Sequence, residues 1–131
     1  MDILSIMTQG KDYLVLSYLS TCKAISILST RCENICIPMN HTFSYDLVVD
    51  AKGVVSRIKV VRTDCQSPSG SYVVNIRKSG KDVSSKEPFS QSMCDFVFVD
   101  SPEGCYLIPS SSITQKRAIT LSQFGEYFIK E

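Results

Sequence analysis

The feature that most constrains the fold of this chain is a hairpin pattern in residues 45–63, which read YDLVVDAKGVVSRIKVVRT. Residues 45–50 and 54–63 are rich in β-branched side chains, which are typical of strands. Gly53 between them provides a turn position at which a positive φ costs little. The stretch therefore predicts two antiparallel strands joined by a turn at residues 51–53.

The second strand of this hairpin presents two different faces, because side chains alternate along a strand. One face carries two basic residues and an apolar residue: Arg57, Lys59 and Val61. The other face is mainly apolar and should point into the core: Ile58, Val60 and Arg62. Asp46 stands at the entrance of the first strand. If the chain carries out chemistry, this pairing of an acid with a basic strand face is where we expect it.

Residues 3–29 are mostly apolar with small polar residues and no proline. Two lines of residues recur at spacings of three and four, the first being Leu14, Tyr18, Cys22, Ile25 and Ser29 and the second Leu16, Leu19 and Lys23. This periodicity predicts an amphipathic helix over at least residues 13–28. Thr8 and Asp12 are the two residues suited to cap its start.

The rest of the chain adds further β-type runs bounded by turn residues. They are residues 35–38, 71–77, 93–100, 105–109 and 118–121. We expect residues 71–77 to form a third strand of the main sheet, with Tyr72, Val74 and Ile76 on one face. The runs around the turn at residues 101–104 should form a second hairpin.

Two segments outside these runs bear on partners. Residues 78–91 are polar and include Gly80 and Pro88, so we expect a flexible segment that contacts a partner. Residues 124–129 are rich in aromatic side chains and should dock on the sheet or on another copy of the chain.

Length and composition predict one domain, residues 1–131, with a sizeable core. No apolar run approaches the roughly 18 residues of a membrane helix, and the start lacks a basic secretory n-region. We therefore expect an intracellular protein in a reducing compartment, with its six cysteines as free thiols. Cys32, Cys36 and His41 offer three ligands at an unusual spacing, so no structural zinc is expected.

Two stretches resemble a known superfamily. The run CDFVFVDSPEGCYLIP at residues 94–109, together with Asp46 and its hairpin, is similar to the small PD-(D/E)XK nucleases, the intron-encoded homing endonucleases and Holliday-junction resolvases. The resemblance covers roughly residues 17–121. It implies an α/β (α+β) fold of the restriction-endonuclease type, with a mixed central sheet flanked by an N-terminal helix.

The same resemblance assigns site positions. In the family an Asp, an acid or Gln followed two residues later by Lys, and a helix acid hold a divalent cation. Asp46 matches the Asp, whereas Lys59 stands at the acid or Gln position, Val61 at the Lys position and Thr21 at the helix acid. One carboxylate beside an ammonium group is a poor Mg²⁺ site, so we expect Lys59 to replace the metal charge and to pair with Asp46. A one-residue register shift would bring Arg62 to the site, but it would expose the core face of the strand.

Three functions remain open. The first is a catalytically inactive nuclease-like protein that binds DNA or RNA without a cofactor, with phosphate contacts from Arg57, Lys59, Arg62, Arg77, Lys78 and Lys81. The second is a structural subunit of a larger assembly, joined to proteins or to copies of itself by its apolar N-terminus and aromatic tail. The third is an active, Mg²⁺-dependent homing endonuclease. The net charge of only +1 favours the second over the first, and the missing acids count against the third.

Overall fold

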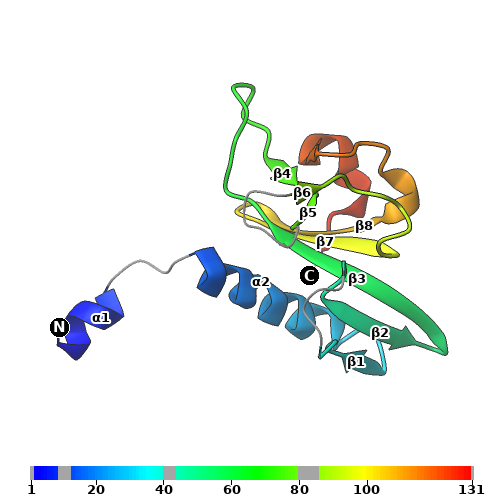
Figure 1. Ribbon diagram of the computed structural model, residues 1–131, viewed down its shortest axis with the longest axis horizontal. Helices are drawn as coiled ribbons and strands as arrows, with labels where there is room; N and C mark the ends of the chain where they lie inside the picture. Colours follow the sequence, from blue (N-terminus) through cyan, green and yellow to red (C-terminus); the bar gives the residue numbers. More distant parts are fainter. Residues whose placement is uncertain (1, 9–12, 40–43, 80–85, 131) are drawn as a thin grey trace.

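The computed structural model describes residues 2–8, 13–39, 44–79 and 86–130. Its centre is a five-stranded sheet in the order β1-β2-β3-β7-β8 (Figure 1). The strands are β1 (Asn34–Cys36), β2 (Leu47–Ala51), β3 (Val54–Arg62), β7 (Phe96–Ser101) and β8 (Gly104–Pro109). Strands β3 and β7 run parallel, and the other neighbours run antiparallel. The sheet is therefore mixed, which confirms the predicted α/β (α+β) class.

The predicted hairpin is confirmed as β2 and β3, with Ala51 opposite Val54. The two turn residues, Lys52 and Gly53, have φ values of 54° and 84°. Two successive positive φ values give the turn the twist that a tight hairpin needs. The Gly53 N–H also donates a 3.0 Å hydrogen bond to Asp50 Oδ1, which fixes the turn.

Helix α2 (Tyr13–Leu28) covers one face of the sheet, and its bounds match the prediction. Among the residues of α2 whose burial is described, 16–28, the buried ones are Ser20, Ala24 and Leu28, which lie four apart. The first line of residues that predicted the helix lies mostly outside this face, since Tyr18 is 64% exposed and Cys22 is exposed as well, although Ile25 packs against the same core. The small side chains of Ser20 and Ala24 let the helix approach the sheet closely. A pattern of large apolar residues therefore does not identify the buried face of α2.

The N-terminal cap prediction is wrong for Thr8, which ends a separate helix, α1 (Ile3–Thr8). The Ser5 N–H donates to Asp2 Oδ1 at 2.8 Å, so Asp2 caps the start of α1. Asp12 lies outside the described residues.

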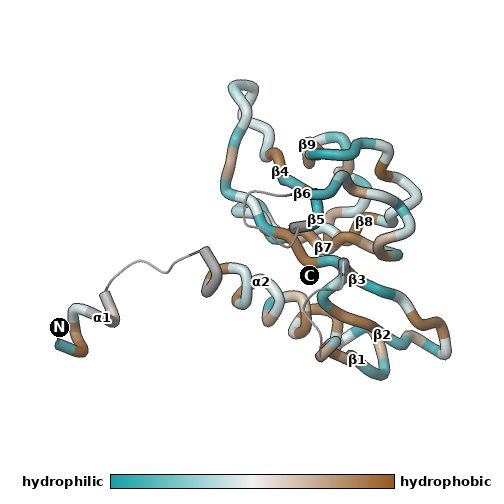
Figure 2. Tube along the Cα trace, in the orientation of Figure 1, coloured by the Kyte–Doolittle hydropathy of each residue, from teal (hydrophilic) through white to brown (hydrophobic). Residues whose placement is uncertain are grey.

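A second layer covers the opposite face of the sheet. It contains a two-stranded sheet of β4 (Val73–Asn75) and β9 (Ala118–Thr120), and the 3₁₀ segments η1 (Ser110–Ser112) and η2 (Leu121–Tyr127). Tyr72, Val74 and Ile76 pack into this layer's core, as predicted. The expectation that residues 71–77 join the main sheet is wrong, because β4 pairs with β9 in a separate two-stranded sheet. Figure 2 shows the apolar trace of β7 and β8 between the layers.

The polar segment at residues 78–91 is partly ordered by pairing. Strand β5 (Lys78–Ser79) pairs with β6 (Lys86–Glu87), and residues 80–85 lie outside the described residues. Phe89, three residues after Lys86, is 4% exposed and belongs to the second-layer core. The prediction of a flexible segment is therefore wrong for residues 86–91, because a buried aromatic ring anchors them.

The C-terminal segment docks on the sheet of its own chain, which settles the choice left open above. Ile129 is buried against the helix side of the core, and its N–H donates to Cys105 O at 2.8 Å. The Phe128 ring meets Tyr106 edge-on, with centroids 5.2 Å apart. Gly104 lies beneath this ring, where an added Cβ would come within 2.7 Å of it. The second hairpin, β7 and β8, therefore needs glycine at its turn.

All six cysteines are free thiols, as predicted. Among the described residues, no helix is both long enough and apolar enough to cross a bilayer.

Candidate functional site

Asp46 and Lys59 lie on the sheet face that points away from helix α2. Leu47 and Ile58 face each other in the β2–β3 register, and both are buried under α2. Asp46, which precedes Leu47, and Lys59, which follows Ile58, must therefore point to the opposite face. Val61, two residues after Lys59, packs against the second-layer core. The predicted division of β3 into two faces is confirmed.

The Asp46 carboxyl is held at the start of this hairpin by backbone groups. Its Oδ2 accepts a 2.7 Å hydrogen bond from the Val60 N–H, and its own N–H donates to Ile58 O at 2.8 Å. The residue as a whole is exposed, although its carboxyl lies against the backbone of β3. Burial raises the pKa of Asp46, although the Val60 hydrogen bond and the Lys59 charge oppose the increase.

Lys59 is a buried cation, with only 8% of its surface exposed. Burial lowers its pKa, because an ammonium group loses hydration there. The Asp46 carboxylate opposes this decrease, and the charges of Lys78 and Lys86 reinforce it. We call Lys59, Lys78 and Lys86 the cationic cluster. Burial of a lysine among other lysines is costly, which is typical of a site kept for function.

The predicted pairing of Lys59 with Asp46 takes the form of an electrostatic interaction rather than a close ion pair. The ion pairs within 4 Å between described residues are Lys23–Asp100 and Arg57–Asp95. The Asp46 and Lys59 charges still influence each other's pKa. A gap between the two charges leaves each able to interact with a ligand.

The other two family positions do not complete this site. The Thr21 hydroxyl donates to Ser17 O at 3.3 Å within α2, the helix on the opposite face of the sheet. Val61 lies on the Lys59 face but is apolar and packs against the core. Of the four positions, the structure thus brings Asp46 and Lys59 together and gives neither Thr21 nor Val61 a polar contact with them in the described chain.

The residues at this site do not fit the divalent cation that the family resemblance implies. Mg²⁺ needs several oxygen ligands, and among the described residues Asp46 is the one carboxylate that acts on the Lys59 ammonium. Within the described ranges, no three His, Cys, Asp or Glu side chains come together as a possible metal site. His41 lies outside those ranges, so the expectation that it binds no zinc stays a prediction.

The described residues predicted to bind nucleic acid do not all lie on one face of the sheet. Arg57 is engaged by Asp95, with Nε 3.3 Å from Oδ2, and its guanidinium lies 5.8 Å from the Tyr45 ring centroid. Arg62 follows the α2-facing side of β3, opposite Lys59. Arg77 donates from Nε to Asn75 Oδ1 at 3.2 Å.

Of the remaining members, Lys78 lies near Lys59, and Lys81 lies outside the described residues. Lys86 joins the site although the sequence did not indicate it. It arrives through the β5–β6 pairing, and strands of two residues leave no readable periodicity. A role of these residues in nucleic-acid binding stays a prediction.

A second polar cluster lies on the α2 side of the sheet. Asp100 accepts a 2.8 Å hydrogen bond from the Ser20 hydroxyl and a 3.2 Å contact from Lys23 Nζ, on different carboxylate oxygens. Ser20 is 2% exposed, so this bond satisfies a buried hydroxyl. We call Ser20, Lys23 and Asp100 the helix clamp, because they tie α2 to β7. Sequence reasoning missed it, since it joins segments far apart in the chain.

Comparison with known proteins agrees with this architecture. The chain superimposes on the structure of a bacterial homing endonuclease with a TM-score of 0.72 and 22% sequence identity, covering 85% of this chain and 78% of that one. No curated protein matches the chain significantly. The family model for PD-(D/E)XK endonuclease matches residues 16–124. The span includes α2 from its second turn onward, the whole central sheet and most of the second layer, so the chain belongs to the PD-(D/E)XK endonuclease family.

Proposed function

We propose that this chain is a catalytically inactive nuclease-like protein that binds nucleic acid without a metal ion and serves as an accessory part of a nucleoprotein assembly. One observation carries the proposal. Lys59, a buried ammonium group, occupies the strand position at which the family resemblance places a metal-binding acid or Gln. A positive charge fixed at that point can meet a phosphate directly, with no cation between them.

The surroundings of Lys59 support phosphate binding. Lys78 and Lys86 add two more positive charges close enough to lower the pKa of Lys59. An arriving phosphate would relieve the repulsion among the three ammonium groups, so binding and charge relief act together. Each phosphate that the cluster neutralises adds about −0.9 to the slope of log affinity against log salt concentration for a duplex, and less for single strands.

Two matched assays test this function. The first incubates supercoiled plasmid with the protein and Mg²⁺ or Mn²⁺, beside an Asp46→Asn variant. We expect no nicking in either sample. Metal-dependent nicking that the Asp46→Asn change abolishes would show an active endonuclease and overturn the proposal.

The second assay measures a gel shift with DNA and with RNA in the presence of a chelator. We expect retained binding that Lys59→Met weakens by about tenfold, the cost of one charged hydrogen bond. Lys52→Met is the control, because Lys52 is exposed at the turn of the same hairpin, away from the cationic cluster. Equal losses in both variants would mean that bulk charge, and not Lys59, drives binding.

A structural-subunit role remains a second candidate, favoured by the N-terminal helix. Ile3, Leu4 and Met7 of α1 are each 70% exposed or more, with no charged residue among them. Such an apolar surface is typical of a contact with protein. If neither nicking nor a gel shift occurs, co-purification of a fixed set of proteins, lost on deleting residues 1–8, would establish this function instead.

A further inference from the structure

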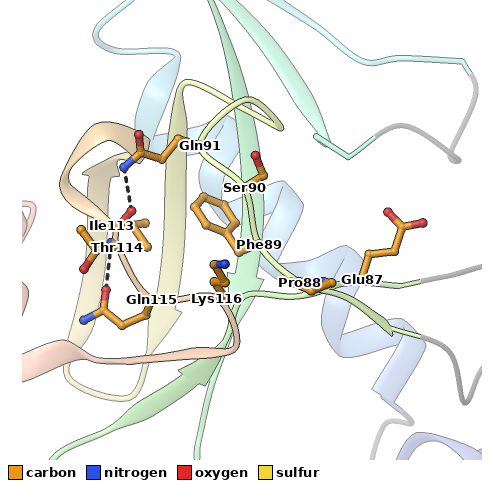
Figure 3. Close-up of a pocket in the computed structure, with 9 residues that line it drawn as sticks. All are labelled: Glu87, Pro88, Phe89, Ser90, Gln91, Ile113, Thr114, Gln115 and Lys116. Atoms are coloured by element: carbon orange, nitrogen blue, oxygen red, sulfur yellow. Dashed lines mark hydrogen bonds between the residues drawn. The ribbon is translucent and has the colours of Figure 1, made fainter.

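A pocket of about 780 Å³ lies in the second layer, between the segments at residues 87–91 and 113–116 (Figure 3). Phe89 and Ile113 line it, but both side chains are buried in the core and offer a partner little apolar surface. No large apolar side chain that is exposed in the described chain lines this pocket, whereas five of them lie on α1 and α2. The apolar surface that a partner could cover is therefore concentrated on these two helices.

One side of helix α2 is exposed and uncharged. We call Tyr18, Leu19, Cys22 and Ser26 the outer face of α2. Tyr18 is 64% exposed and Leu19 is 44% exposed, and the other two are exposed as well. Successive residues of a helix are about 100° apart, so these four lie opposite the buried line that packs against the sheet. The one charged residue of α2, Lys23, pairs with Asp100 of the sheet.

Two properties of the helices favour a partner for this surface. A helix with apolar or small uncharged residues all round is typical of one that is buried on both sides, and the sheet buries only one side of α2. Helix α1 has six residues, and isolated helices shorter than about 12–15 residues are marginal in water. Ile3 and Met7 of α1 are 75% and 77% exposed. Packing against a partner would therefore stabilise both helices.

The outer face of α2 is complementary in size to a second copy of itself. The large side chains of Tyr18 and Leu19 lie toward its N-terminal end, the small Ser26 lies toward its C-terminal end, and Cys22 lies midway. When two such helices pack antiparallel about a two-fold axis at Cys22, Tyr18 of each copy lies over Ser26 of the other. A large side chain over a small one lets the helix axes approach to the usual 8–10 Å. A parallel pair would instead set Tyr18 against Tyr18 and leave a gap at Ser26.

We propose that the outer face of α2 is the interface of a symmetric dimer of this chain, with α1 of each copy packing against the other copy. An uncharged face does not repel its own copy, whereas a strongly charged partner would lose hydration there without gaining an ion pair. Helices that bind anionic membranes use basic residues, and neither α1 nor the outer face contains one. The interface lies across the sheet from the cationic cluster, so it is independent of the proposed function.

The size of the helices predicts a weak dimer. Helix α2 rises about 24 Å over its 16 residues, so its outer face alone is smaller than the about 800 Å² per partner that standard interfaces bury. Ile3 and Met7 of α1 supply further apolar area. We therefore expect a dissociation constant in the micromolar range.

Sedimentation velocity of the unmodified protein from about 1 to 300 μM, with a reducing agent present, tests the dimer. We expect a concentration-dependent shift from monomer to dimer. Ser26→Phe adds apolar area but sets a ring against Tyr18 of the other copy, so it should weaken the dimer about tenfold. Ser122→Phe adds the same ring at an exposed residue of the second layer and should leave the association unchanged.

Exchanging the large and small residues tests the antiparallel arrangement itself. The double variant Tyr18→Ser with Ser26→Tyr places the ring at the other end of the outer face, so it should restore the affinity that Ser26→Phe loses. Tighter association of Ser26→Phe would mean that the face is a non-specific apolar surface and would overturn the two-fold packing.

Crosslinking of the unmodified protein gives an independent readout. A short bismaleimide should join Cys22 of one copy to Cys22 of the other, because the two-fold axis passes there. Cys36 and Cys65 are also exposed and serve as internal controls. Dimers joined through Cys36 or Cys65, and not through Cys22, would place the interface elsewhere and overturn the proposal. A monomer at every concentration would overturn it too, and binding of that monomer to phosphatidylcholine vesicles would assign the face to lipid.

Discussion

A lysine and an aspartate interact on each side of the central sheet, Lys23 of α2 with Asp100 on one side and Lys59 with Asp46 on the other, and the two pairs are arranged differently. In the helix clamp, both carboxylate oxygens of Asp100 have partners within 3.2 Å, and Lys23 is half exposed. Across the sheet, Lys59 is buried and Asp46 has a raised pKa, and the two charges are not in close contact. In the first arrangement, both carboxylate oxygens of Asp100 have partners within the chain. In the second, burial disfavours both charges, so a bound ligand with complementary charge would stabilise them.

Removing the carboxylate of each pair should produce the largest contrast. Asp100→Ala leaves the buried Ser20 hydroxyl without its acceptor and Lys23 without its ion pair. We expect it to lower the free energy of unfolding by about 2–3 kcal/mol. Asp46→Ala should cost much less, because it also removes a desolvated charge. Urea unfolding of both variants measures the difference, and equal losses would mean that the Asp46 pair is structural too.

A second contrast comes from reversing the charge at the candidate site. Lys59→Glu places a second carboxylate near that of Asp46. Carboxylate oxygens are the ligands that a hard divalent cation prefers. At Mn²⁺ concentrations tenfold above its dissociation constant, we expect an additional stability of about 1.4 kcal/mol, seen as a rise in Tm. The unmodified protein should show no such rise.

The control for this experiment is the double variant Lys59→Glu with Asp46→Asn, which lacks the second carboxylate. If it responds to Mn²⁺ as the single variant does, the cation binds elsewhere on the chain. A response of the unmodified protein would contradict the view that Lys59 repels a cation from this site.

The two pairs also differ in how much of them the sequence could predict. The β2–β3 hairpin and the shared face of Asp46 and Lys59 followed from local signals, namely Gly53 at the turn and alternation along the strand. The helix clamp did not, because Ser20 is small and polar and gave no sign that it faces the sheet. Burial of a polar residue by a distant partner is set by tertiary packing, which periodicity does not record.

Long-range pairing accounts for the other differences. Residues 71–77 have the pattern of a sheet strand, yet nothing local shows that Val74 pairs with Ile119 rather than with the main sheet. The charge of Lys86 acts on Lys59, and Lys86 is held by the pairing of β5 with β6, which covers two residues on each strand. Alternation specifies which side chains share a face, and it leaves open which strand is the neighbour.

The smallest expected effect is a dependence of stability on pH that belongs to Lys59. Burial lowers its pKa in the folded chain, so between that value and the ordinary lysine value the unfolded chain binds more protons. Within this window, the free energy of unfolding rises with pH, because Lys59 loses its proton more easily in the folded chain. Below the window, Lys59 is charged in the folded chain, and the full cost of burying that charge is present. Lys59→Met has no such group, so its stability relative to the unmodified protein should be greatest at neutral pH and should decline toward alkaline pH. Urea unfolding of both proteins between pH 7 and 10 measures this difference. A constant difference across the range would place the Lys59 ammonium in a well-hydrated setting, like the half-exposed Lys23, and would remove the distinction between the two faces of the sheet.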